Sequence, residues 1–282
     1  MARQLFIKPD RTFYPQMKDR YPAVYLEFGR LEVDDSSVKW INSEGLVVML
    51  PAATLAAIFL GPGTSITHEA LKTLASCNCT VLLTSQNCLS VYCQAVSPTA
   101  DTRNMLMQFS AAFDPEKSLQ TARRLFAFRF KDKDLSKSSL QEMMGIEGSR
   151  VRQLYRDKAL QYGVSWKGRS YIPGKNEQSD PVNRMLTAFN SYLYGICTAV
   201  IVSMGFSPYV GYIHSGCPLP LVYDIADLYK ESTSIDLAFM HAFDKDLTRR
   251  KIADLFIERC CELDILQQIQ NDIKIIFADE KD

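Results

Sequence analysis

The pattern of apolar residues changes once along the chain, near residues 97–101, and this change constrains the fold more than any other feature. Before it, short runs of β-branched and aromatic residues alternate with clusters of turn-forming residues. After it, apolar residues recur at helical spacing over long segments. A chain of 282 residues is long enough for two domains of ordinary size. We therefore expect an α+β protein, with a small, mainly β domain at 1–98 and a larger, all-α domain at 102–282.

The first region predicts short strands separated by turns, with one helix. Thr67 is typical of a helix N-cap and predicts a helix over 68–76. Gly61-Pro-Gly63 predicts a turn, since no phosphate-binding fingerprint surrounds it. The segments expected as strands are 24–33, 38–41, 46–50, 55–60, 80–84 and 89–94.

The second region predicts long helices. Asp114 as N-cap and Pro115 at the first helical position begin the first of them. The segment 181–204 is mostly apolar on every side, which is typical of a helix that runs through a core. The expected helices are 115–130, 143–162, 181–204 and 218–230, followed by one long or two shorter helices within 247–277.

Composition indicates a soluble, reduced protein. Hydrophobic residues make up 47% and charged residues 23%, and no apolar run reaches the roughly 18 residues of a membrane span. The N-terminal residues do not resemble a signal peptide. The eight cysteines lack the paired spacings of zinc sites, so we interpret most of them as small buried hydrophobes. We expect a cytoplasmic protein without a membrane partner.

Charge is balanced overall but unevenly distributed. Residues 1–101 carry 8 basic and 9 acidic side chains, a net charge of −1. Residues 102–185 carry 16 and 9, a net charge of +7, and residues 186–282 carry 8 and 14, a net charge of −6. The basic middle third is compatible with a polyanionic partner, although a solvated helical surface has the same composition.

A single carboxylate interrupts the apolar start of the stretch MMGIEGSRVRQLY at 143–155. Glu147 is either a surface partner of Arg150, three residues away, or a buried ligand at the edge of a basic surface. The local sequence is compatible with both interpretations. The basic side chains that follow Glu147 are Arg150, Arg152, Arg156 and Lys158.

A second acidic pair occurs in GYIHSGCPLPLVYDIADLYK at 211–230. Asp224 and Asp227 are three residues apart on one face of a predicted helix, and the glycine-flanked loop before it contains His214. Two carboxylates with one imidazole are suitable ligands for Mg²⁺ or Mn²⁺. The alternatives are a histidine that caps a loop and an aspartate pair that complements a helix dipole.

Together these features resemble one family. The chain is similar to the catalytic integrase subunit of the CRISPR adaptation complex, in the branch that accompanies Cascade-type (type I-E-like) interference. Three stretches carry the resemblance: GIEGSRVRQLY at 145–155, NSYLYGICTAVIVSMGFSPYVGYIHSG at 190–216 and PLVYDIADLYK at 220–230. It extends over nearly the entire chain, and the Glu, His and Asp motifs follow the order and spacing of the family.

The resemblance implies an integrase that inserts short foreign DNA fragments into a CRISPR array. It implies that Glu147, His214 and Asp227 bind Mg²⁺ or Mn²⁺ and that Asp224 is a further acidic catalytic position. The 3′-hydroxyl of the fragment would attack a phosphodiester at a repeat boundary. Such transesterification requires neither a covalent protein nucleophile nor ATP.

Further positions are implied to contact DNA. Tyr171 and Tyr194 match aromatic residues near the DNA 3′ end, and Phe28 replaces a tyrosine that stacks on the end of the fragment duplex. The sequence departs from the family at Cys217 and Ser65, where relatives have basic residues. The positions that match basic DNA contacts are Arg103, Lys230 and Arg249.

The resemblance also implies the partners. These are double-stranded DNA with 3′ overhangs, CRISPR repeat DNA and the small ferredoxin-like adaptation subunit. We expect a homodimer that associates through the domain at 1–98, because both fragment ends must be joined. Two alternatives remain: a metal-dependent nuclease of branched or single-stranded DNA that uses the same residues, and a DNA-binding scaffold without catalysis.

Overall fold

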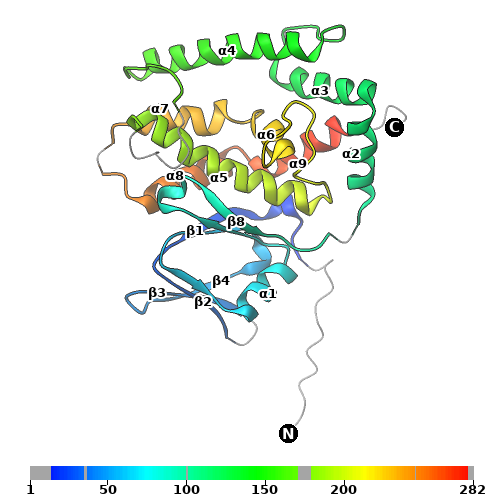
Figure 1. The fold of residues 1–282 in the computed structure, drawn as a ribbon. Helices are drawn as coiled ribbons and strands as arrows, with labels where there is room; N and C mark the ends of the chain where they lie inside the picture. Colours follow the sequence, from blue (N-terminus) through cyan, green and yellow to red (C-terminus); the bar gives the residue numbers. More distant parts are fainter. Residues whose placement is uncertain (1–13, 35–36, 100, 171–178, 245, 279–282) are drawn as a thin grey trace.

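The chain has a β-rich N-terminal region and a helical C-terminal region, as the change of pattern near residues 97–101 predicts (Figure 1). The structure is a computed structural model, which describes residues 14–34, 37–99, 101–170, 179–244 and 246–278. In Figure 1 the strands and α1 lie below the other helices, and α4 lies farthest from the strands.

The first sheet has the strand order β1-β5-β7-β8 and forms the boundary between the two regions. Its central strand β5 is parallel to both β1 and β7, and all six of its residues are buried. Successive side chains of a strand point to opposite faces, so Phe59 faces the helices while Ile58 and Leu60 face the second sheet. The strands are β1 Tyr21–Leu26, β5 Leu55–Leu60, β7 Thr80–Thr84 and β8 Val91–Ala95.

The second sheet has the order β4-β3-β2-β6 and encloses, with α1 (His68–Ser76), a separate small core. The Thr67 hydroxyl accepts from the Ala70 N–H and caps α1, as predicted. The second sheet consists of β2 Gly29–Asp34, β3 Ser37–Asn42, β4 Val47–Leu50 and β6 Thr64–Ile66.

The single strand predicted over 24–33 is wrong. The chain breaks at Phe28, whose φ of 56° is left-handed, so that β1 and β2 belong to different sheets. A left-handed residue other than glycine costs about 1–2 kcal/mol. A hydrogen bond from the Phe28 N–H to the Pro62 carbonyl, 3.0 Å long, holds this turn. Apolar residues of the kinds found in strands occur on both sides of the break, which is why the sequence conceals it.

The helical region is arranged around α5 (Pro181–Ser203), which is the predicted core helix. α5 is long and apolar enough to cross a membrane, but its most apolar stretch is 83% buried inside the protein. α2 and α7 were not predicted. The other helices are α2 Arg103–Phe113, α3 Pro115–Arg129, α4 Leu140–Gln161, α6 Pro220–Ala226, α7 Asp236–His241, α8 Arg249–Glu262 and α9 Ile265–Ile276.

Capping and backbone geometry set the helix limits that differ from the prediction. Ser139 and Glu142 form a capping box, so α4 begins three residues before the predicted 143. The segment 218–230 forms only the short α6, which leads to a π-helical turn at Glu231–Ile235. Asp264, with a φ of 46°, divides the segment 247–277 into α8 and α9.

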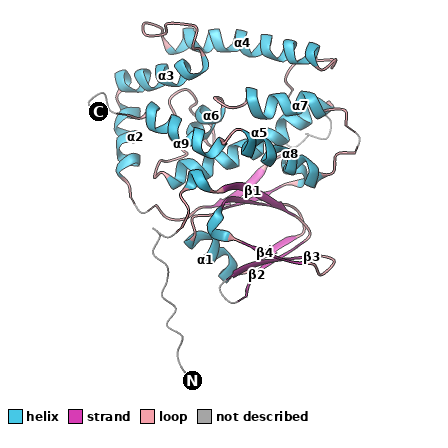
Figure 2. Cartoon of the chain, turned by 180° about the vertical axis from the view of Figure 1, so that it is seen from behind, coloured by secondary structure: helices cyan, strands magenta, loops and turns pink. Residues whose placement is uncertain are grey.

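The hydrophobic core extends across the predicted boundary between the domains. Tyr192 of α5 packs its ring edge-on against Phe59 of β5 and Tyr25 of β1, at centroid distances of 4.9 and 6.1 Å. α8 also contacts β1, and Figure 2 shows the first sheet directly beneath these helices. The first sheet is therefore a platform for α5, and α5 in turn packs against α6 and the π-helical turn.

Candidate active site

Asp224 organises the loop that contains His214. Its carboxylate is completely buried and accepts hydrogen bonds from three consecutive backbone N–H groups, at 212, 213 and 214, over 2.6, 3.2 and 2.9 Å. Gly211 makes this approach possible, because a Cβ there would lie 2.7 Å from Asp224 Oδ2. The aspartate thus fixes the loop to α6.

The same carboxylate sets the orientation of the His214 ring. Asp224 Oδ1 lies 2.8 Å from His214 Nδ1, and a carboxylate can only accept, so we assign the Nδ1 proton to this hydrogen bond. The lone pair of the neutral ring is then on Nε2, which lies 3.9 Å from Asp227 Oδ2. A histidine held by a carboxylate in this way is typical of metal sites.

Asp227 ends α6 and is in contact with two cations. Lys230 Nζ lies 2.5 Å from its Oδ1, and Arg129 Nη1 lies 3.5 Å from its Oδ2. Burial alone would raise the pKa of Asp227, but Lys230 and Arg129 outweigh it and hold the pKa below its ordinary value. Burial would lower the pKa of Lys230, and the Asp227 carboxylate raises it instead. Asp227 is therefore ionised at neutral pH.

Glu147 is a partly buried ion-pair partner, and its partner is Arg129 rather than Arg150. Arg129, the last residue of α3, donates from Nη1 to Glu147 Oε1 on α4. Arg150 instead binds Asp132 Oδ1 at 2.6 Å. Whether Glu147 pairs with Arg150 or is buried therefore depends on a residue of α3, the helix that precedes α4 in the chain.

Two cavities lie on either side of Lys230. One, of about 510 Å³, is lined by the carboxylates of Glu147 and Asp227 together with Arg129 and Arg150. The other, of about 430 Å³, is lined by His214, Tyr194, Tyr223 and Arg169 among others. Lys230 lines both cavities, and its Nζ is 5.2 Å from the centre of the Tyr194 ring.

The three predicted metal ligands lie in one region of the fold, but not in a ligating arrangement. Among the described residues, no three His, Cys, Asp or Glu side chains are close enough to hold a metal ion. The physical reason is the Arg129 guanidinium, which lies between Glu147 and Asp227. The donors themselves suit a hard divalent ion. Asp227 Oδ1 is also buried and accepts no hydrogen bond of good geometry, despite the nearby Lys230.

The sequence suggested that Asp224 and Asp227 could bind one cation together. In the structure, the two carboxylates have different partners. The hydrogen bonds of Asp224 are all made to the loop and to the His214 ring, which lies between the two aspartates. The structure therefore gives Asp224 a positioning role.

The predicted DNA contacts are spread over several parts of the surface. Tyr194 packs edge-on against Tyr223 at 4.8 Å, and Lys230 is paired with Asp227. Arg249 binds Glu27 at 3.2 Å, and its guanidinium is 5.8 Å from the centre of the half-exposed Phe28 ring. Tyr171 lies outside the described residues.

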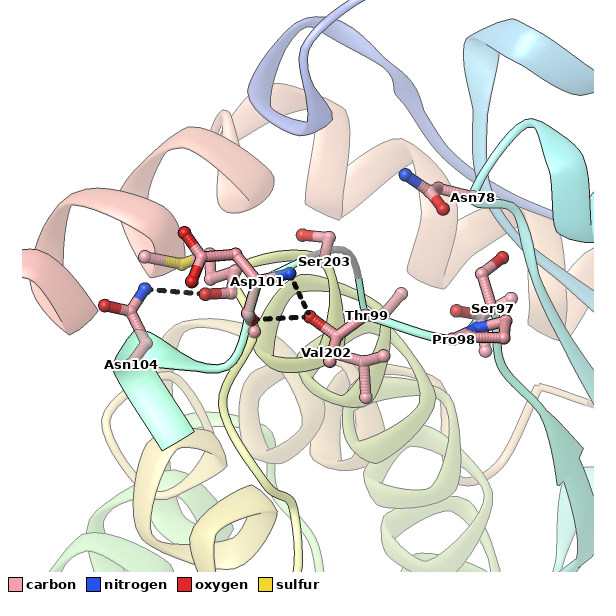
Figure 3. A pocket seen from close by; sticks show the side chains of 12 residues that line it. Asn78, Ser97, Pro98, Thr99, Asp101, Asn104, Val202 and Ser203 are labelled. Carbon is pink, nitrogen blue, oxygen red and sulfur yellow. Dashed lines mark hydrogen bonds between the residues drawn. The ribbon is translucent and has the colours of Figure 1, made fainter. Parts of the chain in front are cut away.

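Arg103 lies apart from the other predicted contacts. It begins α2, where the neighbouring Asn104 donates to the Met204 carbonyl at the end of α5. Figure 3 shows the small cavity, of about 160 Å³, between this end of α5 and the connecting segment at Thr99 and Asp101. At a rise of 1.5 Å per residue, Met204 lies about 15 Å from Tyr194 along the axis of α5. Arg103 is thus not adjacent to the carboxylates.

Sequence reasoning missed Arg129. It ends the amphipathic segment predicted at 115–130, where a basic residue is typical of a helix C-terminus. The sequence did contain one signal, because Arg129 lies between Phe128 and Phe130. Apolar neighbours on both sides indicate that the arginine is partly buried rather than exposed at the end of a helix.

Comparison with known proteins shows the family to which the chain belongs. It is 50% identical over 277 residues to "CRISPR-associated endonuclease Cas1 2" of Chlorobaculum tepidum, which covers 98% of this chain and 94% of the relative. The chain belongs to the Cas1 family. The family profile described as "CRISPR associated protein Cas1" matches residues 129–252, a span that contains Arg129, Glu147, His214 and Asp227.

Other Cas1 proteins agree in sequence and in fold. "CRISPR-associated endonuclease Cas1" of Escherichia coli K12 is 35% identical over 223 residues, which is 79% of this chain and 73% of that protein. The crystal structure of a TtCas1–DNA complex matches with a TM-score of 0.82 at 36% identity, over 91% of this chain and 92% of the other. The resemblance drawn from the three sequence stretches is confirmed at the level of the Cas1 family.

Proposed function

We propose that this Cas1 protein joins the 3′ ends of short DNA fragments to phosphodiesters at the boundaries of a CRISPR repeat. The observation that carries the proposal is the position of Glu147 and Asp227 on one cavity wall, beside a histidine that Asp224 orients. The endonuclease names of the relatives support a reaction at a phosphodiester. The Cascade-associated branch and the cytoplasmic location belong to the same proposal.

Glu147, Asp227 and His214 Nε2 are the groups that would hold a Mg²⁺ or Mn²⁺ ion. When bound, such an ion supplies Lewis acidity at the phosphoryl oxygen. If Nε2 does not bind the ion, His214 can instead accept the proton of the attacking hydroxyl there, because Asp224 binds the Nδ1–H and stabilises the imidazolium that results. The thiols take no part, and burial raises the pKa of Cys197, which lies in the core.

DNA would reach the carboxylates from the open cavities. Tyr194 and Lys230 line the same cavity as His214, which supports their proposed contact with a single-stranded 3′ overhang. Phe28 and Arg249 form an exposed aromatic and cationic pair suited to the end of a duplex. A TtCas1 protein of the same fold was crystallised with DNA. The proposed substrate is double-stranded DNA with 3′ overhangs, and the proposed target is CRISPR repeat DNA.

A nuclease would use the same residues with water as the nucleophile. The two activities are separated by incubating the protein, with the ferredoxin-like adaptation subunit, with a fragment bearing free 3′-hydroxyls and a supercoiled repeat plasmid. An integrase gives joined fragment–plasmid product, whereas cut plasmid alone indicates the nuclease. Glu147→Gln and Asp227→Asn should abolish joining. Asp132→Asn, which removes an exposed carboxylate paired with Arg150, should retain it.

The proposed assembly is a homodimer that associates through the β-rich region at 1–98, with the helical region at 102–282 carrying the catalytic groups. Val47, Val48 and Met49 of β4 expose apolar side chains at the edge of the second sheet, on the opposite side of the first sheet from the helices. Two such dimers would flank the adaptation subunit, so that both fragment ends are joined.

A further inference from the structure

Arg129 is an unusual component of a site that is proposed to bind a divalent ion. Its side chain is only 14% exposed, and its guanidinium contacts two carboxylates from different elements, Glu147 on α4 and Asp227 at the end of α6. Two carboxylates brought together away from water repel each other, and a planar guanidinium with several donors is well suited to neutralise both.

The charges of this cluster are already balanced by protein groups. Arg129 and Lys230 face Glu147 and Asp227, so two cations match two carboxylates. Asp224 adds a negative charge nearby, but its hydrogen bonds come from His214 and from backbone N–H groups rather than from either cation. A divalent ion added between Glu147 and Asp227 would meet a guanidinium in the same position, and like charges at such distances repel strongly.

We propose that Arg129 is the resident counter-cation of the Glu147–Asp227 pair, and that a divalent ion binds between these carboxylates by displacing its guanidinium. This inference rests on the proposed function, because it takes Glu147 and Asp227 as the metal ligands. It explains why the two carboxylates lie on either side of one guanidinium, and why the described residues contain no assembled ligand group in this conformation.

The cavity beside Arg129 has space for the displaced guanidinium. Arg129 ends α3 and lines the open cavity of about 510 Å³ together with Arg150. The two arginines lie near the same ring, Phe130, with guanidinium carbons 5.9 and 5.0 Å from its centre. A rotation of the Arg129 side chain about this ring would put its charge into the cavity, where a DNA phosphate is expected. Metal entry would thus exchange a carboxylate-bound arginine for a phosphate-facing one.

The central test compares Mn²⁺ binding by the full-length wild type, Arg129→Gln and Arg150→Gln, by titration calorimetry without DNA. Loss of a competing charge in direct contact with the ligands should tighten Mn²⁺ binding by about tenfold or more in Arg129→Gln. Arg150→Gln removes the same charge from the same cavity without touching either carboxylate, so its affinity should change by less than about threefold. Equal affinities in wild type and Arg129→Gln, or weaker binding by that variant, would overturn the proposal.

A measurement on the wild type covers the case in which Arg129→Gln fails to fold. In protein labelled with ¹⁵N-arginine, the protected guanidinium signal of Arg129 is identified as the one missing from Arg129→Lys. Saturation with Mg²⁺ should shift this signal or remove it by exchange with solvent. An Arg129 signal that stays unchanged at saturating Mg²⁺ would contradict displacement.

Glu147→Gln separates this inference from the function on which it rests. If neither wild type nor Glu147→Gln binds Mn²⁺, the metal site fails and the role of Arg129 fails with it. If Glu147→Gln loses Mn²⁺ binding while Arg129→Gln binds like the wild type, the metal site stands and only displacement is refuted.

Discussion

Asp224 accepts four hydrogen bonds, three of them from the consecutive N–H groups of 212–214. Asp224→Asn keeps the size of the side chain but removes its charge, and its amide nitrogen cannot accept. We expect a loss of about 2–4 kcal/mol in the free energy of unfolding, because buried N–H groups are left without an acceptor. Urea denaturation followed by circular dichroism measures this change.

The control for this prediction is Asp132→Asn, which neutralises an exposed aspartate bound to Arg150. Its urea midpoint should remain close to that of the wild type, because exposed ion pairs contribute little to stability. An Asp224→Asn midpoint equal to that of Asp132→Asn would show that the loop does not depend on this carboxylate.

At the residue scale, the sequence identified the chemistry of the site but not the partners within it. The three stretches at 145–155, 190–216 and 220–230, which contain Glu147, His214 and Asp227, were sufficient to name the family. The contact between Glu147 and Arg129 was not predictable, because it joins the end of α3 to the middle of α4 across a turn whose geometry no local pattern encodes. The separate roles of Asp224 and Asp227 likewise depend on which way the loop at 211–216 folds back over α6.

α4 presents two different faces, although its basic residues follow one another closely in sequence. Arg150 lines the cavity with Glu147, whereas Arg152 does not. At 100° per residue, Arg152 lies on a face well removed from that of Glu147. Of the three arginines that follow Glu147 on α4, only Arg150 lines this cavity.

This difference predicts a contrast within one helix. Arg150→Gln should weaken DNA binding and reduce the slope of log K against log salt by about one, as expected for one lost phosphate contact. Arg152→Gln carries the same charge change on the same helix and should leave the slope nearly unchanged. Fluorescence anisotropy over a series of salt concentrations measures both slopes, and equal slopes for the two variants would refute a DNA path along the Arg150 face.

The far end of α4 is held by Asp236, the first residue of α7. Its carboxylate binds Lys158 Nζ at 2.7 Å, the Tyr162 hydroxyl at 2.8 Å and Arg259 of α8 at 3.3 Å. Burial on its own would raise the pKa of Asp236, but the hydrogen bonds from Lys158 and Tyr162 outweigh it and lower the pKa. α4 has only two buried side chains, Met143 and Ala159, so this network is a main attachment of the helix.

The lowered pKa of Asp236 determines the direction in which the stability of the fold changes with pH. The ionised Asp236 stabilises the fold above its unfolded pKa of about 3.9, and this stabilisation is lost as the pH falls through the lower, folded value. Asp236→Asn should therefore be less stable than the wild type at pH 7, with a difference that shrinks below about pH 4. Urea midpoints of both proteins at several pH values between 3 and 7 provide the comparison. A difference independent of pH would assign the effect to packing instead.

At the element scale, local signals located most helices and strands. N-caps such as Thr67 and Asp114, and turns such as Gly61–Gly63, act within a few residues and were correctly interpreted. The break at Phe28 was missed, and the sequence left open whether 247–277 holds one helix or two, because each break depends on a left-handed residue other than glycine. Neither residue type marks such a position strongly, and the surrounding tertiary structure maintains it.

The whole molecule differs from two domains joined by a linker. Alternate residues of β5 contribute to the core beneath the helices and to the core of the second sheet. The boundary near residues 97–101 was visible in the sequence as a change in the spacing of apolar residues. The sequence did not show that both regions share the first sheet. A fully buried apolar strand has the same sequence whether a sheet or a helix covers its second face.

The outer edge of the second sheet carries the last prediction. β4 pairs with β3 alone in the part of the chain described, and Val47, Val48 and Met49 are 52%, 41% and 53% exposed. An edge strand with exposed apolar side chains favours association with another strand, and a second copy of β4 offers the same surface about a two-fold axis. Light scattering at low micromolar concentration should therefore give about twice the chain mass of 31.9 kDa.

Val48→Lys places a charge in the centre of this edge and should reduce the measured mass to that of one chain. Leu160→Lys is the matched control, because Leu160 is even more exposed, at 82%, and its helix α4 lies far from the strands (Figure 1). The Val48→Lys protein should join one fragment end but not both, since each active site serves one 3′ end. A monomeric wild type, or a Val48→Lys protein that keeps the wild-type mass, would exclude β4 as the contact between the two chains.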